Sequence, residues 1–129
     1  MDIEIIRAYC MSKPLATEDM AFGPEGLLFR VYHKIFAYLD LDRPNLVVVK
    51  CDPDRAVELR DRYAGVLPAW HWNKKYWNEL HFDTDVPDEV ILALIDHSLD
   101  EVLKKLPKKT RLEYAAVSSS ASSLDTSAS

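Results

Sequence analysis

Lysines and large aromatic residues lie side by side between residues 69 and 82, which read AWHWNKKYWNELHF. All three tryptophans of the chain fall in this stretch, and a lysine pair stands between the second and the third. Lysine ammonium groups neutralise phosphates, aromatic rings stack on exposed bases, and an asparagine amide can read a base edge. The stretch therefore has the chemistry of a nucleic-acid-binding site, and the candidate residues are Trp72, Asn73, Lys74, Lys75 and Tyr76.

Packing is the other use for the same tryptophans, because a small sheet covered by helices needs bulky apolar side chains between its layers. Trp77 lies in residues 76–82, which alternate as a strand does, and we expect it to pack. Trp72 lies beside Asn73 and Lys74 in the connection before that strand. For Trp72, packing and base stacking stay equally open.

A second basic cluster, KKLPKKTR, occupies residues 104–111 and carries five positive charges without an acidic residue. Residues 83–101, just before it, carry seven acidic residues and neither lysine nor arginine. Acids at the start of a helix and bases at its end complement the helix dipole, so this layout by itself stabilises a helix. A functional patch needs other cations to converge on the cluster, and those available are Lys34, Lys50, Lys74 and Lys75. The cluster adds five candidate phosphate-binding residues, Lys104, Lys105, Lys108, Lys109 and Arg111.

Patterns for catalysis and for metal binding are weak. Asp96, His97 and Ser98 are the residue types of a hydrolytic triad, but consecutive residues of a helix point about 100° apart and cannot form a relay. The four histidines have neither i, i+4 spacing on a helix nor a nearby cysteine pair. With three glycines, the chain contains neither a GxGxxG nor a Walker pattern. We therefore expect no catalytic residue, no metal, no cofactor and no enzymatic activity.

Length and composition fit one domain in a reducing compartment. The chain has 129 residues, 48% of them hydrophobic, and a formal net charge of −5. This acidic balance argues mildly against nucleic acid, whose binding proteins are usually basic. Cys10 and Cys51 form no CxxC pattern, and the sequence has neither a signal-peptide pattern nor an apolar run that could span a bilayer. We expect a cytoplasmic monomer with no membrane partner.

Hydrophobic spacing predicts three helices and five strands. Helical stripes cover residues 2–12, 52–64 and 87–106. Alternating or β-branched segments cover residues 27–32, 34–41, 45–51, 66–70 and 76–82. Short connections favour antiparallel hairpins. The order is α-βββ-α-ββ-α, an α+β two-layer domain with helices on one face of an antiparallel sheet of about five strands.

Two further segments stand outside these elements. Residues 16–23, ATEDMAFG, are expected to be irregular or a short strand, closed by a turn at Gly23–Gly26. The Ser-rich residues 114–129 have little apolar surface to bury, and we expect them to be disordered. The predicted domain therefore covers residues 1–113.

Several short motifs stand in a fixed order along residues 2–111. The first are Tyr9-Cys10, Lys13-Pro14, Glu18, Phe22-Gly23, Lys34-Ile35-Phe36-Ala37 and Lys50-Cys51-Asp52-Pro53. They continue with Leu59-Arg60, Tyr63, Val66, Pro68, the specific piece His71-x-Asn73-Lys74-x-x-Trp77, Asp96-His97-Ser98 and Leu106-Pro107. In this order they resemble the bacterial MmcQ/YjbR family.

The resemblance implies a fold and a function. The implied fold is YjbR-like, similar to that of secretion chaperones, in the same α-βββ-α-ββ-α order. Members of the family are called DNA-binding proteins, after the likeness of their sheet to the "double wing" domain of a phage transcription activator. The family motif makes His71, Asn73, Lys74 and Trp77 candidate site residues. The chain departs from the family at Trp72, which replaces a smaller apolar residue.

Two hypotheses follow from the sequence. The first is a small non-enzymatic DNA-binding domain that uses Lys74, Lys75 and residues 104–111 on phosphates, with Trp72 or Asn73 touching bases. The alternative is a protein- or peptide-binding adaptor that uses the exposed surface or edge of the sheet, since a free edge can accept a strand from a partner.

Overall fold

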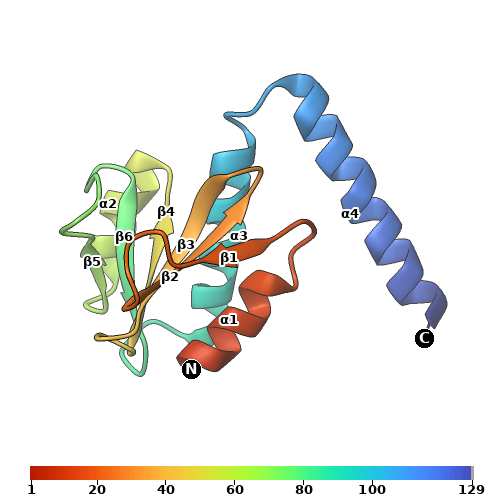
Figure 1. The fold of residues 1–129 in the computed structure, drawn as a ribbon. Helices are drawn as coiled ribbons and strands as arrows, with labels where there is room; N and C mark the ends of the chain where they lie inside the picture. Colours follow the sequence, from red (N-terminus) through yellow and green to blue (C-terminus); the bar gives the residue numbers. More distant parts are fainter. Residues whose placement is uncertain (129) are drawn as a thin grey trace.

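A computed structural model describes residues 1–128 as one sheet with four helices (Figure 1). The helices are α1 (Ile3–Met11), α2 (Pro53–Arg62), α3 (Asp88–Leu103) and α4 (Lys108–Ala128). The strands are β1 (Thr17–Asp19), β2 (Gly26–Val31), β3 (Lys34–Asp40), β4 (Leu46–Lys50), β5 (Val66–Pro68) and β6 (Trp77–His81). No helix among residues 1–128 is long and apolar enough to cross a membrane.

The sheet is antiparallel throughout and has the strand order β1-β2-β3-β4-β6-β5. The α+β class and the order of the expected elements are confirmed. The sixth strand is β1, which lies in the segment expected to be irregular or a short strand. It pairs with β2, where Glu18 faces Phe29. Both edge strands are three residues long.

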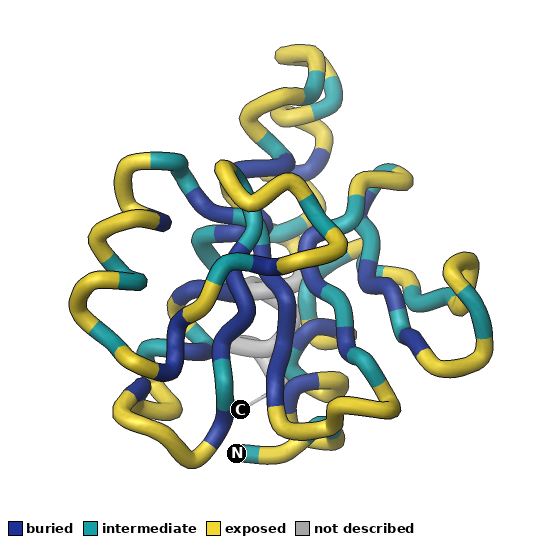
Figure 2. Tube along the Cα trace, turned by 90° about the vertical axis from the view of Figure 1, so that its left-hand side faces the viewer, coloured by how far each residue is buried: buried dark blue, intermediate teal, exposed yellow. Residues whose placement is uncertain are grey.

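The helices α1 and α3 cover one face of the sheet, and α2 packs beside β5. Alternation along the strands sends Ala37, Leu39, Val47 and Val49 into the core beneath these helices. Figure 2 shows this buried core running along the central strands, with exposed positions at the connections and on the outer sides of the helices. The opposite face carries a smaller cluster in which Tyr38, Trp72 and Trp77 pack on Leu46, Val48 and Ala69.

The three residues Asp96, His97 and Ser98 hold separate parts of the fold together. Ser98 donates a hydrogen bond to the carbonyl of Phe36 (2.6 Å) and accepts one from the backbone N–H of Lys50 (2.8 Å). His97 Nε2 accepts from the backbone N–H of Asp52 (3.1 Å), at the start of α2. Consecutive residues on α3 thus point to different partners, as the helical geometry predicts.

Asp96 turns toward α1. The hydroxyl of Tyr9 donates to its carboxylate (2.8 Å), and Lys13 forms an ion pair with it. The three residues therefore form no relay, and their contacts fix α1, β3, β4 and α2 around α3.

The C-terminal segment differs from the expected disorder of residues 114–129. The helix α4 continues through the Ser-rich stretch to Ala128, and Ser129 lies outside the described residues. Tyr114, one residue beyond the predicted domain boundary, is buried and packs edge-on against Tyr32, with ring centroids 6.1 Å apart. The composition of the segment does not reveal that Tyr114 packs against Tyr32. Once a first turn is held, each added residue contributes a hydrogen bond at little cost, and alanine and glutamate favour the extension.

Candidate nucleic-acid interface

A basic depression opens at one end of the sheet. Its volume is about 400 Å³, and we call it the basic pocket. Its lining comes from the β2–β3 hairpin, the end of β4, the start of β6 and the C-terminal end of α3. The lining residues are Arg30, His33, Lys34, Ile35, Lys50, Trp77, Val102 and Lys105. Four cations from separate elements therefore surround one tryptophan.

Local backbone geometry places the first of these cations. Tyr32 and His33 both have positive φ, 50° and 67°, as a two-residue hairpin turn of type I′ requires. Histidine tolerates this region better than most residues, so the turn forms without glycine. The turn sets Lys34 directly opposite Val31 at the end of the hairpin. Arg30 stays next to it because Nε donates to Asp19 (2.6 Å) and a terminal nitrogen donates to the His33 carbonyl (3.0 Å).

Strand register places Lys50 beside Trp77. The two residues are direct partners across β4 and β6, and the Lys50 backbone is held by Ser98. Lys105 follows the last turn of α3, where its backbone N–H donates to the Val102 carbonyl (3.3 Å). The end of α3 thus carries Lys105 to the pocket formed by the strands.

The three lysines of the basic pocket have no counter-ion within the described part of the chain. No carboxylate there lies within 4.0 Å of the Nζ of Lys34, Lys50 or Lys105. Burial lowers the pKa of Lys50, and repulsion from Lys105 and Lys34 lowers it further, although Glu101 partly offsets this. A bound anion would relieve the repulsion, so the pocket favours anionic groups such as phosphate.

Only some of the cations predicted from the sequence reach this pocket. Lys105 lines it, as does Trp77, but Lys104 forms an ion pair with Glu101 on α3. Lys74 is exposed and lies over the ring of Trp70, 3.9 Å from the centroid. The other three predicted cations, Lys108, Lys109 and Arg111, are exposed on α4 and do not line the pocket.

Lys75 adjoins the basic pocket through Tyr76. The Nζ atoms of Lys75 and Lys50 lie 5.5 and 6.0 Å from the centroid of the Tyr76 ring. Asn73 shapes this turn, because its side-chain oxygen accepts from the backbone N–H of Lys75 (3.1 Å). Its backbone carbonyl accepts from Tyr76 and Trp77, both at 3.0 Å. The two oxygens of Asn73 therefore stabilise the turn, which leaves its side-chain NH2 as the group that can donate to a base.

Four aromatic rings gather on the face of the sheet that the helices leave uncovered. Trp72 lies at the centre, with ring centroids 4.5 Å from Trp77, 5.5 Å from Tyr38 and 5.7 Å from Phe22. Trp72 and Trp77 are half-buried, and Phe22 is 58% exposed. The expected packing of Trp77 is confirmed, and Trp72 packs with it. Phe22 supplies the open ring, which the strand pattern of the sequence did not single out.

A buried carboxylate lies below these rings. Glu79 accepts two hydrogen bonds from Arg43, both at 3.0 Å, and its Oε1 lies 3.1 Å from His81 Nε2. Burial by itself raises the pKa of Glu79, but the bonds to Arg43 and His81 outweigh it and lower the pKa overall. Exposed His71 joins Arg43 and Trp72 around the small depression of about 140 Å³ above Glu79. Within residues 1–128, no three His, Cys, Asp or Glu side chains gather as metal ligands would.

The chain matches known proteins over most of its length. The model of the YjbR family matches residues 11–101. An uncharacterised protein of Escherichia coli, YjbR, is 30% identical over 112 residues, which cover 86% of this chain and 95% of that protein.

Solved structures show the same fold. A crystal structure of a Deinococcus radiodurans protein has a TM-score of 0.81 at 32% identity, and the match covers 88% of this chain and 87% of that one. A Pseudomonas syringae protein shares the fold, with a TM-score of 0.65 over 76% of this chain and 96% of that one, at 23% identity. On the family match and the relative together, the chain belongs to the YjbR family.

Proposed function

We propose that this protein is a small, non-enzymatic, cytoplasmic DNA-binding domain that holds the phosphate backbone in the basic pocket. One observation carries the proposal, namely that Lys34, Lys50 and Lys105 converge from three elements and have no counter-ion among the residues that the structure describes. Side chains held apart from carboxylates are ready to neutralise phosphates, which supply most of the affinity of non-specific DNA binding. Trp77 in the wall and Tyr76 beside it add aromatic surface for a sugar or base.

The acidic net charge of −5 is compatible with this proposal because the cations are local. The acidic residues gather elsewhere, for instance at the start of α3, where Asp88 and Glu89 favour the positive end of the helix dipole. Such a layout limits the contact to a few phosphates. We therefore expect modest affinity and little sequence preference.

The test is fluorescence anisotropy with labelled duplex and single-stranded DNA at low and at moderate salt. Lys34→Ala, Lys50→Gln and Lys105→Ala should each weaken binding about fivefold, because each removes one charge-assisted contact. Lys74→Ala is the matched control, since it removes the same charge from an ammonium group that lies over Trp70. Absence of binding at low salt would contradict the proposal. Equal losses in Lys74→Ala and Lys105→Ala would contradict the assignment to the basic pocket.

The adaptor alternative finds little support at the sheet edges. Both edge strands, β1 and β5, are three residues long, and Pro68 in β5 has no backbone N–H to donate. A partner strand would gain few main-chain hydrogen bonds there. We therefore place DNA binding first.

A further inference from the structure

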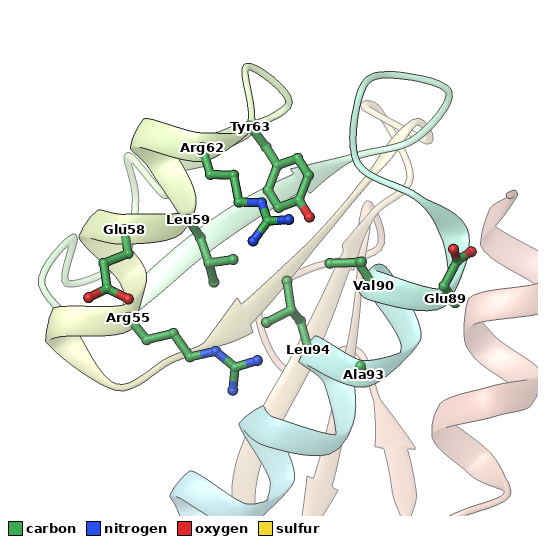
Figure 3. A pocket seen from close by; sticks show the side chains of 9 residues that line it. All are labelled: Arg55, Glu58, Leu59, Arg62, Tyr63, Glu89, Val90, Ala93 and Leu94. Carbon is green, nitrogen blue, oxygen red and sulfur yellow. The ribbon is translucent and has the colours of Figure 1, made fainter.

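A second depression separates α2 from the N-terminal half of α3. Its volume is about 540 Å³, and we call it the α2–α3 cleft (Figure 3). It lies at the opposite end of α3 from Lys105 and shares no lining residue with the basic pocket. The lining residues are Arg55, Glu58, Leu59, Arg62, Tyr63, Glu89, Val90, Ala93 and Leu94.

The floor of the cleft is apolar. Leu59 from α2 and Leu94 from α3 face each other across it, with Val90 beside them (Figure 3). Leu94 is only 1% exposed and belongs to the main core, whereas Leu59 and Val90 are half-buried. An apolar side chain laid in the cleft would therefore bury the remaining surface of these residues and gain the corresponding hydrophobic free energy.

Two arginines extend over this floor. The side chains of Arg55 and Arg62 both reach from α2 toward α3, while Glu58 between them points away (Figure 3). Among the residues that the structure describes, no carboxylate lies within 4.0 Å of either guanidinium. Arg62 instead lies over the ring of Tyr63, 5.3 Å from the centroid. Arg60 on the same helix differs, because it donates to the carbonyls of Ala56 and Lys74.

The spacing of the two arginines sets the kind of ligand. They are seven residues apart on α2, which corresponds to two helical turns, or about 10 Å along the axis. A ligand that uses both therefore needs two anionic groups at a similar distance, with an apolar group between them. An amphipathic helix with two acidic residues seven apart has this layout, and guanidinium groups bind carboxylates with two parallel hydrogen bonds.

We propose that the α2–α3 cleft binds an acidic amphipathic helix of a protein partner. Leucine-like side chains of the partner fill the floor at Leu59, Val90 and Leu94, and its two carboxylates pair with Arg55 and Arg62. The apolar floor favours an amphipathic peptide over DNA, because a phosphate backbone has no apolar group to lay between the two arginines. The site is separate from the basic pocket, so this proposal does not rest on DNA binding.

The probe is a fluorescein-labelled helical peptide with glutamates seven residues apart and leucines three and four residues after the first. Anisotropy should show saturable binding. The same peptide with glutamine in place of both glutamates should bind at least about tenfold more weakly, because both charged contacts are lost. Equal binding of the two peptides, or no binding of either, would overturn the proposal.

Variants locate the binding on the cleft. Arg55→Gln and Arg62→Gln should each weaken the glutamate peptide about tenfold, and Ala93→Glu, at an exposed position on the rim, should abolish binding. Arg111→Gln on α4 removes the same charge outside the cleft and should leave binding unchanged. Far-ultraviolet circular dichroism checks that each variant is folded.

Two results would count against the assignment. An equal loss in Arg111→Gln would mean that the peptide responds to net charge alone. If duplex DNA lost its binding to Arg55→Gln and Arg62→Gln while the peptide bound neither variant nor the parent protein, the cleft would be a phosphate site and the proposal would fail.

Discussion

Lys50 shows, at the scale of single residues, how the core prepares the basic pocket. Its backbone is fixed by Ser98 and by the pairing with Trp77, and its side chain is left among other cations. The hydroxyl of Ser98 also donates a hydrogen bond to the carbonyl of Phe36 on the neighbouring strand β3. A buried hydroxyl with two hydrogen bonds thus holds the strand that presents a partly desolvated lysine.

His97 is the residue through which pH should act on stability. Burial lowers the pKa of His97 below its ordinary value of 6.5, and the nearby Arg55 lowers it further, while Glu101 opposes this. The folded state therefore favours neutral imidazole, whose Nε2 accepts the hydrogen bond from Asp52 N–H. A folded-state pKa below the unfolded one gives stability that is present above the unfolded pKa and is lost as the pH falls toward the folded pKa.

The measurement is urea unfolding of the parent protein and of His97→Gln between about pH 7.5 and pH 5.5, a range that spans the ordinary pKa of histidine. The free energy of unfolding of the parent protein should fall with pH more steeply than that of the variant. Parallel curves for the parent protein and His97→Gln would contradict the prediction.

The contribution of helix α4 to stability can be divided between the buried Tyr114 and the rest of the helix. Tyr114 is buried against Tyr32, whereas Leu112 is 60% exposed and Val117 is 38% exposed. Deletion of residues 107–129 removes the buried tyrosine and should cost about 3 kcal/mol, as loss of a buried aromatic side chain does. Deletion of residues 119–129 keeps Tyr114 and should change the free energy of unfolding by less than about 0.5 kcal/mol.

Thermal and urea unfolding of the two deletion variants and the parent protein compare these costs. Tyr114→Ala in the full-length chain is the matched variant, and it should reproduce most of the loss in the longer deletion. If the shorter deletion destabilises as much as the longer one, the outer turns of α4 contribute contacts beyond Tyr114 and the division is wrong.

The regular elements could be predicted from the sequence because each has a strong local pattern. Ile91, Ile95, Leu99 and Val102 recur at helical spacing, and all four are buried in α3. In contrast, β1 is only three residues long, too short for alternation to show. The helical course of α4 depends on Tyr114 reaching Tyr32, a tertiary contact that composition does not contain.

The candidate site was only partly predictable for a similar reason. The sequence identified Trp77 and Lys105, and it named Lys34 and Lys50 as cations that would have to converge. Whether they meet depends on which strands pair, in what register, and on where α3 ends. Lys74 and Lys75 are neighbours in the chain, yet one lies over Trp70 and the other beside Tyr76. Sequence proximity to the tryptophans therefore indicated the region and not the individual cations.

At the scale of the whole molecule, an acidic protein that holds DNA in the basic pocket should bind it with a salt dependence set by only three phosphate contacts. Each neutralised phosphate contributes about −0.9 to the slope of log K against log salt, so three lysines predict a slope of about −2.7. A fourfold rise in salt should then weaken binding about fortyfold. Anisotropy titrations at four or more salt concentrations give this slope directly, and Lys105→Ala should reduce its magnitude by about one. A slope steeper than about −5 would require cations beyond the basic pocket, such as those on α4, and would contradict binding through three lysines.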